Sequence, residues 1–182
     1  VNDVPVAAAV STSTDEDTAK DITLSATDVE GSSLTYSIVS YPSINGNSTF
    51  DTSEVDGDNL ITYTPPANWN GTETFTYKAN DGSLDSNTAT VTITVNPVND
   101  IPVANDVSQS TNEDTAKTIT LSATDVEGTS LTYRLVSNPS NGSIFQFQHF
   151  ESTSMTYTPN ANWYGTDTFT YKVTENGTND SN

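Results

Sequence analysis

Cysteine is absent from this sequence, and histidine occurs only once, as His149. Disulfides are therefore excluded, and neither a thiolate nucleophile nor a cluster of nitrogen and sulfur metal ligands is available. The sequence also has no Gly-x-Ser-x-Gly motif, no phosphate loop and no Gly-x-Gly-x-x-Gly motif. Because no nucleophile–base set clusters or recurs, we predict that the protein is not an enzyme and that His149 is an ordinary residue of a strand.

Basic residues are scarce: five Lys and Arg stand against 24 Asp and Glu, for a net charge of −19. Binding to nucleic acid needs Lys and Arg to neutralise phosphates, so nucleic acid is excluded as a partner and an anionic membrane surface is disfavoured. No apolar run approaches the roughly 18 residues of a membrane span, so we predict no membrane insertion. The acidic charge either forms a solvated surface or is partly held in cation sites.

The chain does contain an internal repeat. The stretch Val95–Pro102 restates the phrase Val1–Pro5 that opens the chain, and the same motifs follow each in the same order. Asp3 and Asp100 mark this period, which is close to 100 residues. A period of that length corresponds to one small domain per repeat rather than to one turn of a solenoid. The sequence therefore predicts two tandem domains with almost no linker.

We place the domains at residues 1–97 and 98–182. The second repeat lacks a counterpart of Thr88–Val95, so its domain is expected to be C-terminally truncated and without its last strand. A sandwich that lacks one strand leaves a neighbouring edge unpaired. We interpret the sequence as a piece of a longer array whose natural chain continues. Donation of the strand by another molecule is the alternative.

Alternation of apolar and polar residues dominates both repeats. Leu34, Tyr36 and Ile38 alternate with Thr35 and Ser37, which is the period of a half-buried antiparallel strand. Asn-Gly, Asp-Gly and Glu-Gly pairs separate such runs and mark tight turns. In the first repeat we expect strands near residues 5–12, 20–27, 33–40, 47–51, 59–64, 73–80 and 87–96. The fold class is therefore all-β, with two tandem seven-stranded Greek-key β-sandwiches of the cadherin or immunoglobulin type.

Several acidic and amide residues recur where the expected strands end. The domain start and the second-to-third and sixth-to-seventh loops lie at one end of such a sandwich, so their side chains should converge there. In the first repeat these residues are Asp3, Asp28, Glu30 and Asp81, and in the second they are Asn99, Asp100, Asp125, Glu127, and Glu175 or Asn176. Glu16 and Glu113 begin the second strand of each repeat at the opposite pole, so Glu16 is expected to face the start of the next domain.

These residues supply oxygen ligands only, and such sets favour Ca²⁺ over transition metals. Carboxylates gathered within a Debye length of about 8 Å would repel one another unless a cation lay among them. The alternative is that Asp, Asn and Gly recur because turns need them, although turns do not demand the recurring glutamates. We therefore predict Ca²⁺ as the cofactor, bound around the junction of the two domains.

The same residues carry a resemblance to a known family. The run Ala26–Gly31 resembles the Asp-x-Asp loop of cadherin repeats, and Glu16–Thr18 resembles their N-terminal glutamate motif. The tract Tyr63–Thr72 is typical of bacterial cadherin-like domains, which occur in tandem in large secreted or surface adhesins. The resemblance implies calcium between consecutive domains and an extended stalk. Asn68–Asn70 stands where animal cadherins have an Asp-Arg-Glu motif, so we expect one or two ions per junction rather than three.

We thus predict a calcium-rigidified structural and adhesion module in the stalk of a large bacterial surface or secreted protein, located outside the cell. Its expected partners are adjacent domains of the same chain, with homophilic protein contacts or polysaccharide as further possibilities. The alternative function is a carbohydrate-binding accessory module, because Trp69 and Trp163 recur and exposed rings could stack on sugars. The other interpretation of the two tryptophans is that they plug one end of each sandwich.

Overall fold

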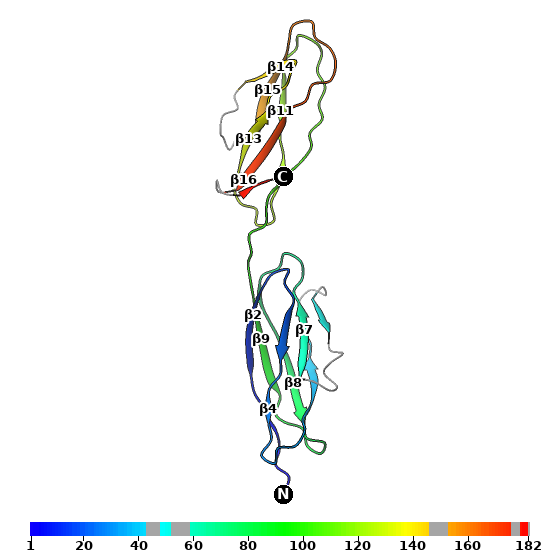
Figure 1. Ribbon diagram of the computed structural model, residues 1–182, viewed down its shortest axis with the longest axis vertical. Coiled ribbons are helices and arrows are strands. Elements are labelled where there is room, and N and C mark those ends of the chain that lie inside the picture. The colour runs from blue at the N-terminus through cyan, green and yellow to red at the C-terminus, as the bar shows by residue number, and fades with distance from the viewer. Residues whose placement is uncertain (43–47, 52–58, 146–152, 176–178, 182) are drawn as a thin grey trace. The chain divides into compact units, whose positions relative to one another are not determined.

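The structure is a computed structural model that describes residues 1–42, 48–51, 59–145, 153–175 and 179–181. It divides into two compact units, Val1–Val98 (unit 1) and Asn99–Asn182 (unit 2). The described residues form strands, turns and irregular segments (Figure 1). Among them there is no helix with the length and apolar character needed to cross a membrane. The predicted all-β fold class is confirmed.

Unit 1 contains nine described strands. They are β1 (Val6–Ala7), β2 (Val10–Asp15), β3 (Lys20–Thr23), β4 (Ala26–Thr27), β5 (Thr35–Ser40), β6 (Thr49–Asp51), β7 (Leu60–Thr64), β8 (Gly71–Asn80) and β9 (Ala89–Asn96). One sheet has the order β2-β9-β8-β5, a second has the order β3-β7-β6, and β1 pairs with β4. The alternation predicted from the sequence places one face of each strand in a common core.

That core lies between the sheets of unit 1. In β9 every second residue is buried, and Val91 and Ile93 have no exposed surface. They pack with Phe75 and Tyr77 from the neighbouring strand β8 and with Ile22 from β3 in the other sheet. Threonines occupy the outward positions of β9, where their β-branched side chains suit the pleated surface.

The first predicted strand of unit 1 is divided in two. β1 pairs with β4 in an antiparallel manner, whereas β2 pairs with β9 in a parallel manner over six residues. A single strand near 5–12 was expected, so this part of the prediction is wrong in its bounds. The division has a long-range cause, because the Tyr77 hydroxyl from β8 donates to the backbone between β1 and β2 at Ala8 O.

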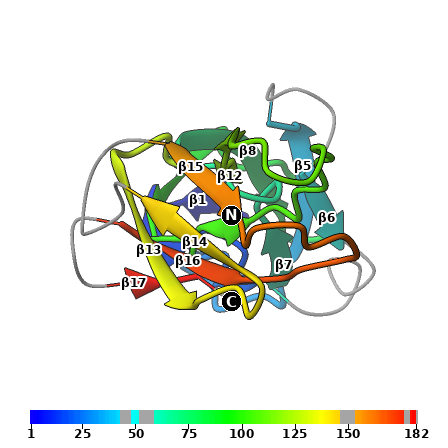
Figure 2. The same cartoon turned by 90° about the horizontal axis from the view of Figure 1, so that it is seen from above.

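Unit 2 repeats much of this plan. Its described strands are β10 (Val103–Ala104), β11 (Lys117–Thr120), β12 (Ala123–Thr124), β13 (Leu131–Ser137), β14 (Gly142–Phe145), β15 (Ser154–Pro159), β16 (Thr170–Glu175) and β17 (Asn179–Asp180). The sheets have the orders β11-β15-β14 and β13-β16-β17, with β10 paired to β12. β13 and β16 lie side by side in antiparallel register (Figure 2).

Two expectations for unit 2 concern its less regular parts. The described residues contain no counterpart of β9, and residues 105–116 form no strand. His149 was expected to be an ordinary residue of a strand; β14 ends at Phe145, and His149 lies outside the described residues.

Candidate metal sites

The loop between β4 and β5 turns around the carboxylate of Asp28. Its Oδ1 accepts a hydrogen bond from the Ser32 amide at 2.9 Å, and Gly31 supplies the positive φ of 72° that closes the turn. The other oxygen, Oδ2, is buried and has no hydrogen-bond partner. A buried carboxylate oxygen without a donor is energetically costly, so a proton, a hydrogen-bond donor or a cation beside this atom would stabilise it.

Unit 2 reproduces this arrangement after β12. Asp125 Oδ1 accepts from the amide and the hydroxyl of Thr129, at 2.9 and 3.1 Å, and Gly128 has a φ of 67°. Asp125 Oδ2 is likewise buried without a hydrogen-bond partner. These two oxygens are the only buried side-chain oxygen or nitrogen atoms of the described residues that lack one. The same unsatisfied atom in both repeats indicates a shared requirement rather than an accident of one loop.

The start of each unit is hydrogen-bonded to the glutamate that lies two residues after the buried aspartate. In unit 1 the Asp3 amide donates to Glu30 Oε2 at 3.3 Å. In unit 2 the Asp100 amide donates to Glu127 at 3.3 and 3.4 Å. Both glutamates are exposed, so their carboxylates stay accessible to an ion. The predicted convergence of the domain start with the loop after the second strand is therefore present within each unit.

A second contact joins the start of each unit to the end of β8 or β16, since Asp81 directly follows β8 and Glu175 is the last residue of β16. Asn2 Nδ2 donates to Asp81 Oδ2 at 2.7 Å in unit 1, and Asn99 Nδ2 donates to Glu175 Oε2 at 2.6 Å in unit 2. Asp81 and Glu175 thus hold equivalent places, and Asn176, the other candidate that the sequence offered, lies outside the described residues. Asn2 was missed as a site residue, although its recurrence as Asn99 was the signal that could have found it.

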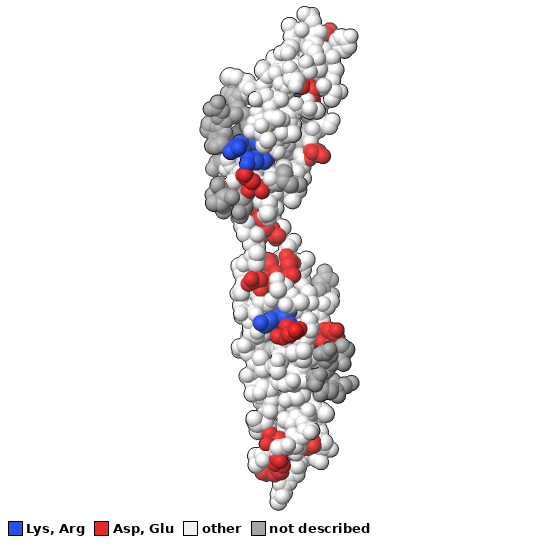
Figure 3. Space-filling view, viewed as in Figure 1, with Lys and Arg blue, Asp and Glu red and all other residues white. Residues whose placement is uncertain are grey.

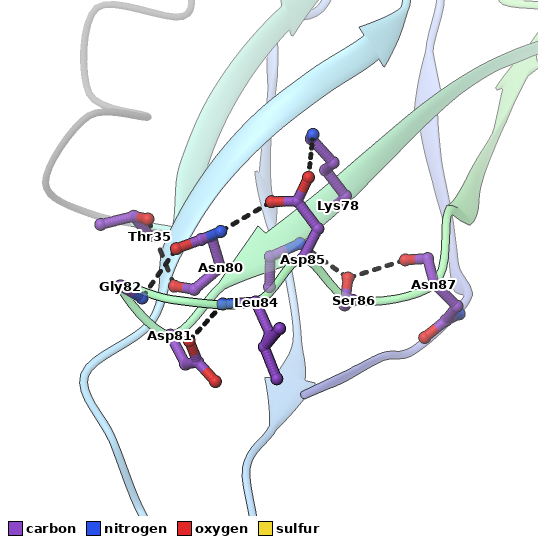
Figure 4. A network of polar contacts seen from close by, with 10 residues as sticks. Thr35, Lys78, Asn80, Asp81, Gly82, Leu84, Asp85, Ser86 and Asn87 are labelled. Carbon is purple, nitrogen blue, oxygen red and sulfur yellow. Dashed lines mark hydrogen bonds and ion pairs between the residues drawn. The ribbon is translucent and has the colours of Figure 1, made fainter. Parts of the chain in front are cut away.

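Asp81 is held mainly by the backbone of its own turn (Figure 4). Its Oδ1 accepts from the amides of Ser83 and Leu84, both at 2.7 Å. These bonds, the Leu84 amide first, together with the Asn2 side chain, lower the pKa of the Asp81 carboxyl below its ordinary value. Asp81 therefore remains charged in mildly acidic solution and keeps a carboxylate at this end of unit 1.

The two glutamates of the opposite pole differ between the units. Glu16 is 4% exposed, and its Oε1 accepts from the Val98 amide at 2.6 Å. The Glu16 amide in turn donates to the carbonyl of Asn96 at 2.9 Å. Glu113 is exposed. In unit 1 the chain after β9 covers the glutamate, and no described segment of unit 2 does so.

The described residues contain no group of three or more His, Cys, Asp and Glu side chains close enough to hold a metal ion by themselves. Calcium sites also use amide and backbone carbonyl oxygens, so a calcium site does not need three acidic side chains. The chemistry of the donor set, oxygen throughout, fits a hard cation.

The two tryptophans lie against backbone glycines. A Cβ added to Gly71 would come within 2.8 Å of the Trp69 ring, and one added to Gly165 within 3.1 Å of the Trp163 ring. Trp69 also packs against the core of unit 1. Both side chains are half-buried. The structure therefore favours the interpretation that the tryptophans plug one end of each sandwich, and disfavours the interpretation that they are exposed rings for stacking on sugars.

A comparison with protein families decides the relationship. The family model described as "Bacterial Ig domain" matches residues 2–94 and again residues 99–182. This chain belongs to the bacterial Ig domain family. The tandem arrangement predicted from the repeat is thus two bacterial Ig domains in succession.

Solved structures similar to this pair of bacterial Ig domains include cadherin ectodomains. Human desmocollin-1 matches with a TM-score of 0.54 at 16% identity, over 97% of this chain and 38% of that one. Mouse cadherin-23 repeats 22–24 match with a TM-score of 0.51 at 22% identity, over 98% and 61%. At these identities the likeness concerns the fold, and it confirms the cadherin-like architecture that the sequence motifs implied.

Curated relatives of this bacterial Ig domain pair include integrin beta-like protein C of Dictyostelium discoideum. It is 30% identical over an alignment of 142 residues, and the match covers 71% of this chain and 7% of the relative. Integrin beta-like protein B of the same organism is 31% identical over 104 residues, 57% of this chain and 5% of the relative. The chain therefore spans less than a tenth of the length of either relative.

Proposed function

We propose that this pair of bacterial Ig domains is a calcium-binding structural module of an adhesion-type protein. Calcium stiffens the junction of consecutive domains, and the module acts as part of a stalk outside the cell, on a bacterial surface or in a secreted protein. The tandem domains, the cadherin-like fold and the integrin beta-like relatives support an adhesion-type role. The partners that the proposal requires are adjacent domains of the same chain.

The observation that carries the calcium proposal is the buried Oδ2 of Asp28 and of Asp125, each without a hydrogen-bond partner. Leaving a charged oxygen buried and unpaired is expensive, and a group so placed either binds a proton, finds a donor or coordinates a cation. A cation at the start of each domain would supply the missing charge.

The residues that would hold the ion come from three segments in each unit. In unit 2 they are Asn99, Asp100, Asp125, Glu127 and Glu175, and in unit 1 they are Asp3, Asp28, Glu30 and Asp81. Calcium accepts six to eight oxygen ligands with flexible geometry, which suits a set of carboxylate, amide and backbone oxygens. When bound, the ion supplies positive charge to these carboxylates and cross-links the segments that carry them.

Glu16 supplies the connection to the junction. Its carboxylate accepts from the Val98 amide, and Val98 directly precedes the candidate ligands Asn99 and Asp100 in the chain. We therefore propose Glu16 as the acidic residue of unit 1 that takes part in calcium binding at the junction. Glu113 is the corresponding residue of unit 2, and we propose the same role for it toward a following domain.

Calorimetric titration with Ca²⁺ tests the proposal. Extracellular calcium modules often have dissociation constants of about 10⁻⁴–10⁻³ M, so millimolar Ca²⁺ should give saturable binding. The D28N and D125N variants should each lose one class of site, and the double variant should lose both. The D21N variant is the matched control, because Asp21 is an exposed aspartate that accepts from Thr62 and belongs to neither set. Unchanged binding in the double variant would refute the assignment.

A further inference from the structure

Four residues other than glycine have a positive φ among those that the structure describes, and they form two hydrogen-bonded pairs. In unit 1 the pair is Asp17, with a φ of 57°, and Asn68, with a φ of 54°. Asp17 Oδ1 accepts from the Asn68 amide at 2.9 Å. A positive φ is uncommon for residues other than glycine, although Asp and Asn tolerate it best. We call this pair the Asp17–Asn68 latch.

Unit 2 contains the same arrangement. Asp114 and Asn162 each have a φ of 56°, and Asp114 Oδ1 accepts from the Asn162 amide at 2.8 Å. The two partners are 51 residues apart in unit 1 and 48 residues apart in unit 2. A backbone conformation that costs free energy persists only where the surrounding structure fixes it. Its recurrence at both partners in both units therefore indicates a requirement of these turns.

The turn that carries Asp17 also carries Glu16. Glu16 directly precedes Asp17, is 4% exposed, and accepts from the Val98 amide through Oε1 at 2.6 Å. The Glu16 amide donates to the carbonyl of Asn96 at 2.9 Å. Because the φ of Asp17 sets the direction of the chain on either side of it, this angle also sets the direction of the Glu16 side chain.

The other partner of the latch lies in a turn that is anchored to the core. The Trp69 amide donates to the carbonyl of Pro66 at 3.2 Å, and the Trp69 side chain packs against the core of unit 1. Asn68 directly precedes this tryptophan. The latch therefore ties the turn that carries Glu16 to a part of unit 1 whose position is fixed by packing.

Unit 2 shows that the latch does not depend on a buried glutamate. Glu113 directly precedes Asp114 and is exposed, yet the bond between Asp114 and the Asn162 amide is as short as its counterpart in unit 1. The conformation of the turn is thus the same whether its glutamate is covered or not. The latch is not a by-product of the contact that the Glu16 carboxylate makes.

We propose that Asp17 is a positioning residue for Glu16, and that Asp114 has the same role for Glu113. The Asp17 carboxylate holds the turn in its positive-φ conformation, and the Glu16 carboxylate is thereby oriented to accept from the Val98 amide. For calcium the inference rests on the proposed function: an oriented Glu16 takes part in binding without first being ordered. Partners that orient the residues of a metal site change metal affinity by about 10- to 100-fold.

The test compares D17G with D17N in the 182-residue protein. D17G removes the acceptor and adopts a φ of 57° without strain, whereas D17N keeps a side-chain oxygen that can accept and also tolerates this angle. We expect D17G to speed hydrogen exchange of the Val98 amide about tenfold relative to the amides of β9, because the Glu16 contact opens more often. One class of calcium site should weaken about tenfold. D17N should retain most of the exchange protection and of the affinity.

Two variants serve as controls. Y77F removes a hydroxyl that contacts the backbone at Ala8 and Ser25, so it should destabilise unit 1 without speeding Val98 exchange relative to β9. D114G makes the equivalent change in unit 2 and should leave Val98 exchange unchanged. If D17G did not fold, D17S would replace it, because the serine hydroxyl lies one bond closer to the backbone than Oδ1 does.

Unchanged Val98 exchange after removal of the Asp17 carboxylate would overturn the proposal. A D17N variant as impaired as D17G would also overturn it, because an acceptor at this position would then not be what orients Glu16. If the wild type bound no calcium, the calcium proposal would fail, and Val98 exchange would still decide whether Asp17 positions Glu16.

Discussion

Each domain places one carboxylate against a tyrosine hydroxyl inside the fold. In unit 1 Glu73 is 2% exposed and accepts from the Tyr63 hydroxyl, and burial followed by this contact raises the pKa of Tyr63. In unit 2 Asp167 accepts from the Tyr157 hydroxyl at 3.0 Å. These acids lie outside the candidate metal sets, so part of the acidic character of the chain is structural.

Asp167 gives the first prediction at this scale. Burial alone would raise the pKa of its carboxyl, but donors led by the amides of Asn141 and Ser140, each at 2.9 Å, outweigh burial and lower it below 3.8. A lowered pKa in the folded state contributes stability above the unfolded pKa, and that contribution is lost as the pH falls through the folded value. We expect D167N to reduce the free energy of unfolding of unit 2 by about 1–2 kcal/mol at pH 7.

The difference between wild type and D167N should shrink as the pH falls below about 3.8, the ordinary aspartate value. Urea denaturation of the two proteins at pH 7 and at pH 3 measures this difference. D106N is the control, because Asp106 is an exposed aspartate of the same unit and its removal should change stability by less than about 0.5 kcal/mol. A difference that is equal at both pH values would contradict the assignment.

At the scale of the element, the division of the first strand sets the architecture of unit 1. β1 joins β4 and β2 joins β9, so one stretch of chain serves two sheets. The Tyr77 hydroxyl lies 2.6 Å from Ala8 O and 2.7 Å from Ser25 O, and it accepts from the Ser25 amide at 3.1 Å. One side chain from β8 therefore contacts the backbone both between β1 and β2, at Ala8, and between β3 and β4, at Ser25.

Removing this hydroxyl should loosen the division. We expect Y77F to lower the free energy of unfolding by about 1–2 kcal/mol, because backbone groups beside Ala8 and Ser25 lose a buried partner. Chemical denaturation measures the loss, and hydrogen exchange should show faster exchange of the Ala8 amide, which donates to Ser25 O. Y36F is the control, since that ring lies 6.1 Å from the ring of Tyr77 in the same cluster. An equal loss in both variants would argue against a special role for the Tyr77 hydroxyl.

The strands could be predicted from the sequence, but their pairing could not. Alternation along β5, β8 and β9 marks both the strands and their buried faces, because a half-buried strand has a period of two. The split between β1 and β2 has no local signal, since Ala8 and Ala9 interrupt the run with neither glycine nor proline. It depends on a hydroxyl almost 70 positions away, and local pattern carries no information about such contacts.

The candidate site could likewise be predicted only in part from the sequence. Recurrence pointed to Asp28 and Asp125, because the same acid at the same place in two repeats stands out from the other acids. The pairing of Asn99 with Glu175 followed only from the hydrogen bond in the structure. Residue type and spacing therefore identified the loops, and three-dimensional contacts identified which atoms lie together.

For the whole molecule, the charge balance is the dominant property. Five basic residues cannot neutralise 24 acids, and the described residues form two ion pairs, Lys78 with Asp85 and Lys172 with Asp180. Figure 3 shows acidic side chains at both ends of unit 1, with few basic ones on the visible face. Like charges of this density repel one another, so cations from solution should reduce the repulsion between acidic side chains.

The last prediction separates a junction site from a site that merely stabilises one domain. In the calcium proposal, the candidate ligands around Asp125 belong to the start of the second domain, which directly follows Val98. The candidate ligands around Asp28 belong to the start of the first domain. Small-angle scattering of the wild type should show a larger and better-defined maximum dimension in millimolar Ca²⁺ than in chelator. D125N should lose this response, because it removes the buried carboxylate oxygen of the second domain start on which the proposed junction site depends.

D28N is the matched control, since it removes the equivalent carboxylate oxygen from the first domain and should keep the scattering response while losing one calcium site. E16Q should weaken the response without removing either buried aspartate, because a neutral amide is a poorer calcium ligand than a carboxylate. If D28N and D125N responded alike, calcium would act on each domain separately. The stiffening role would then be wrong, even if both sites bound the ion.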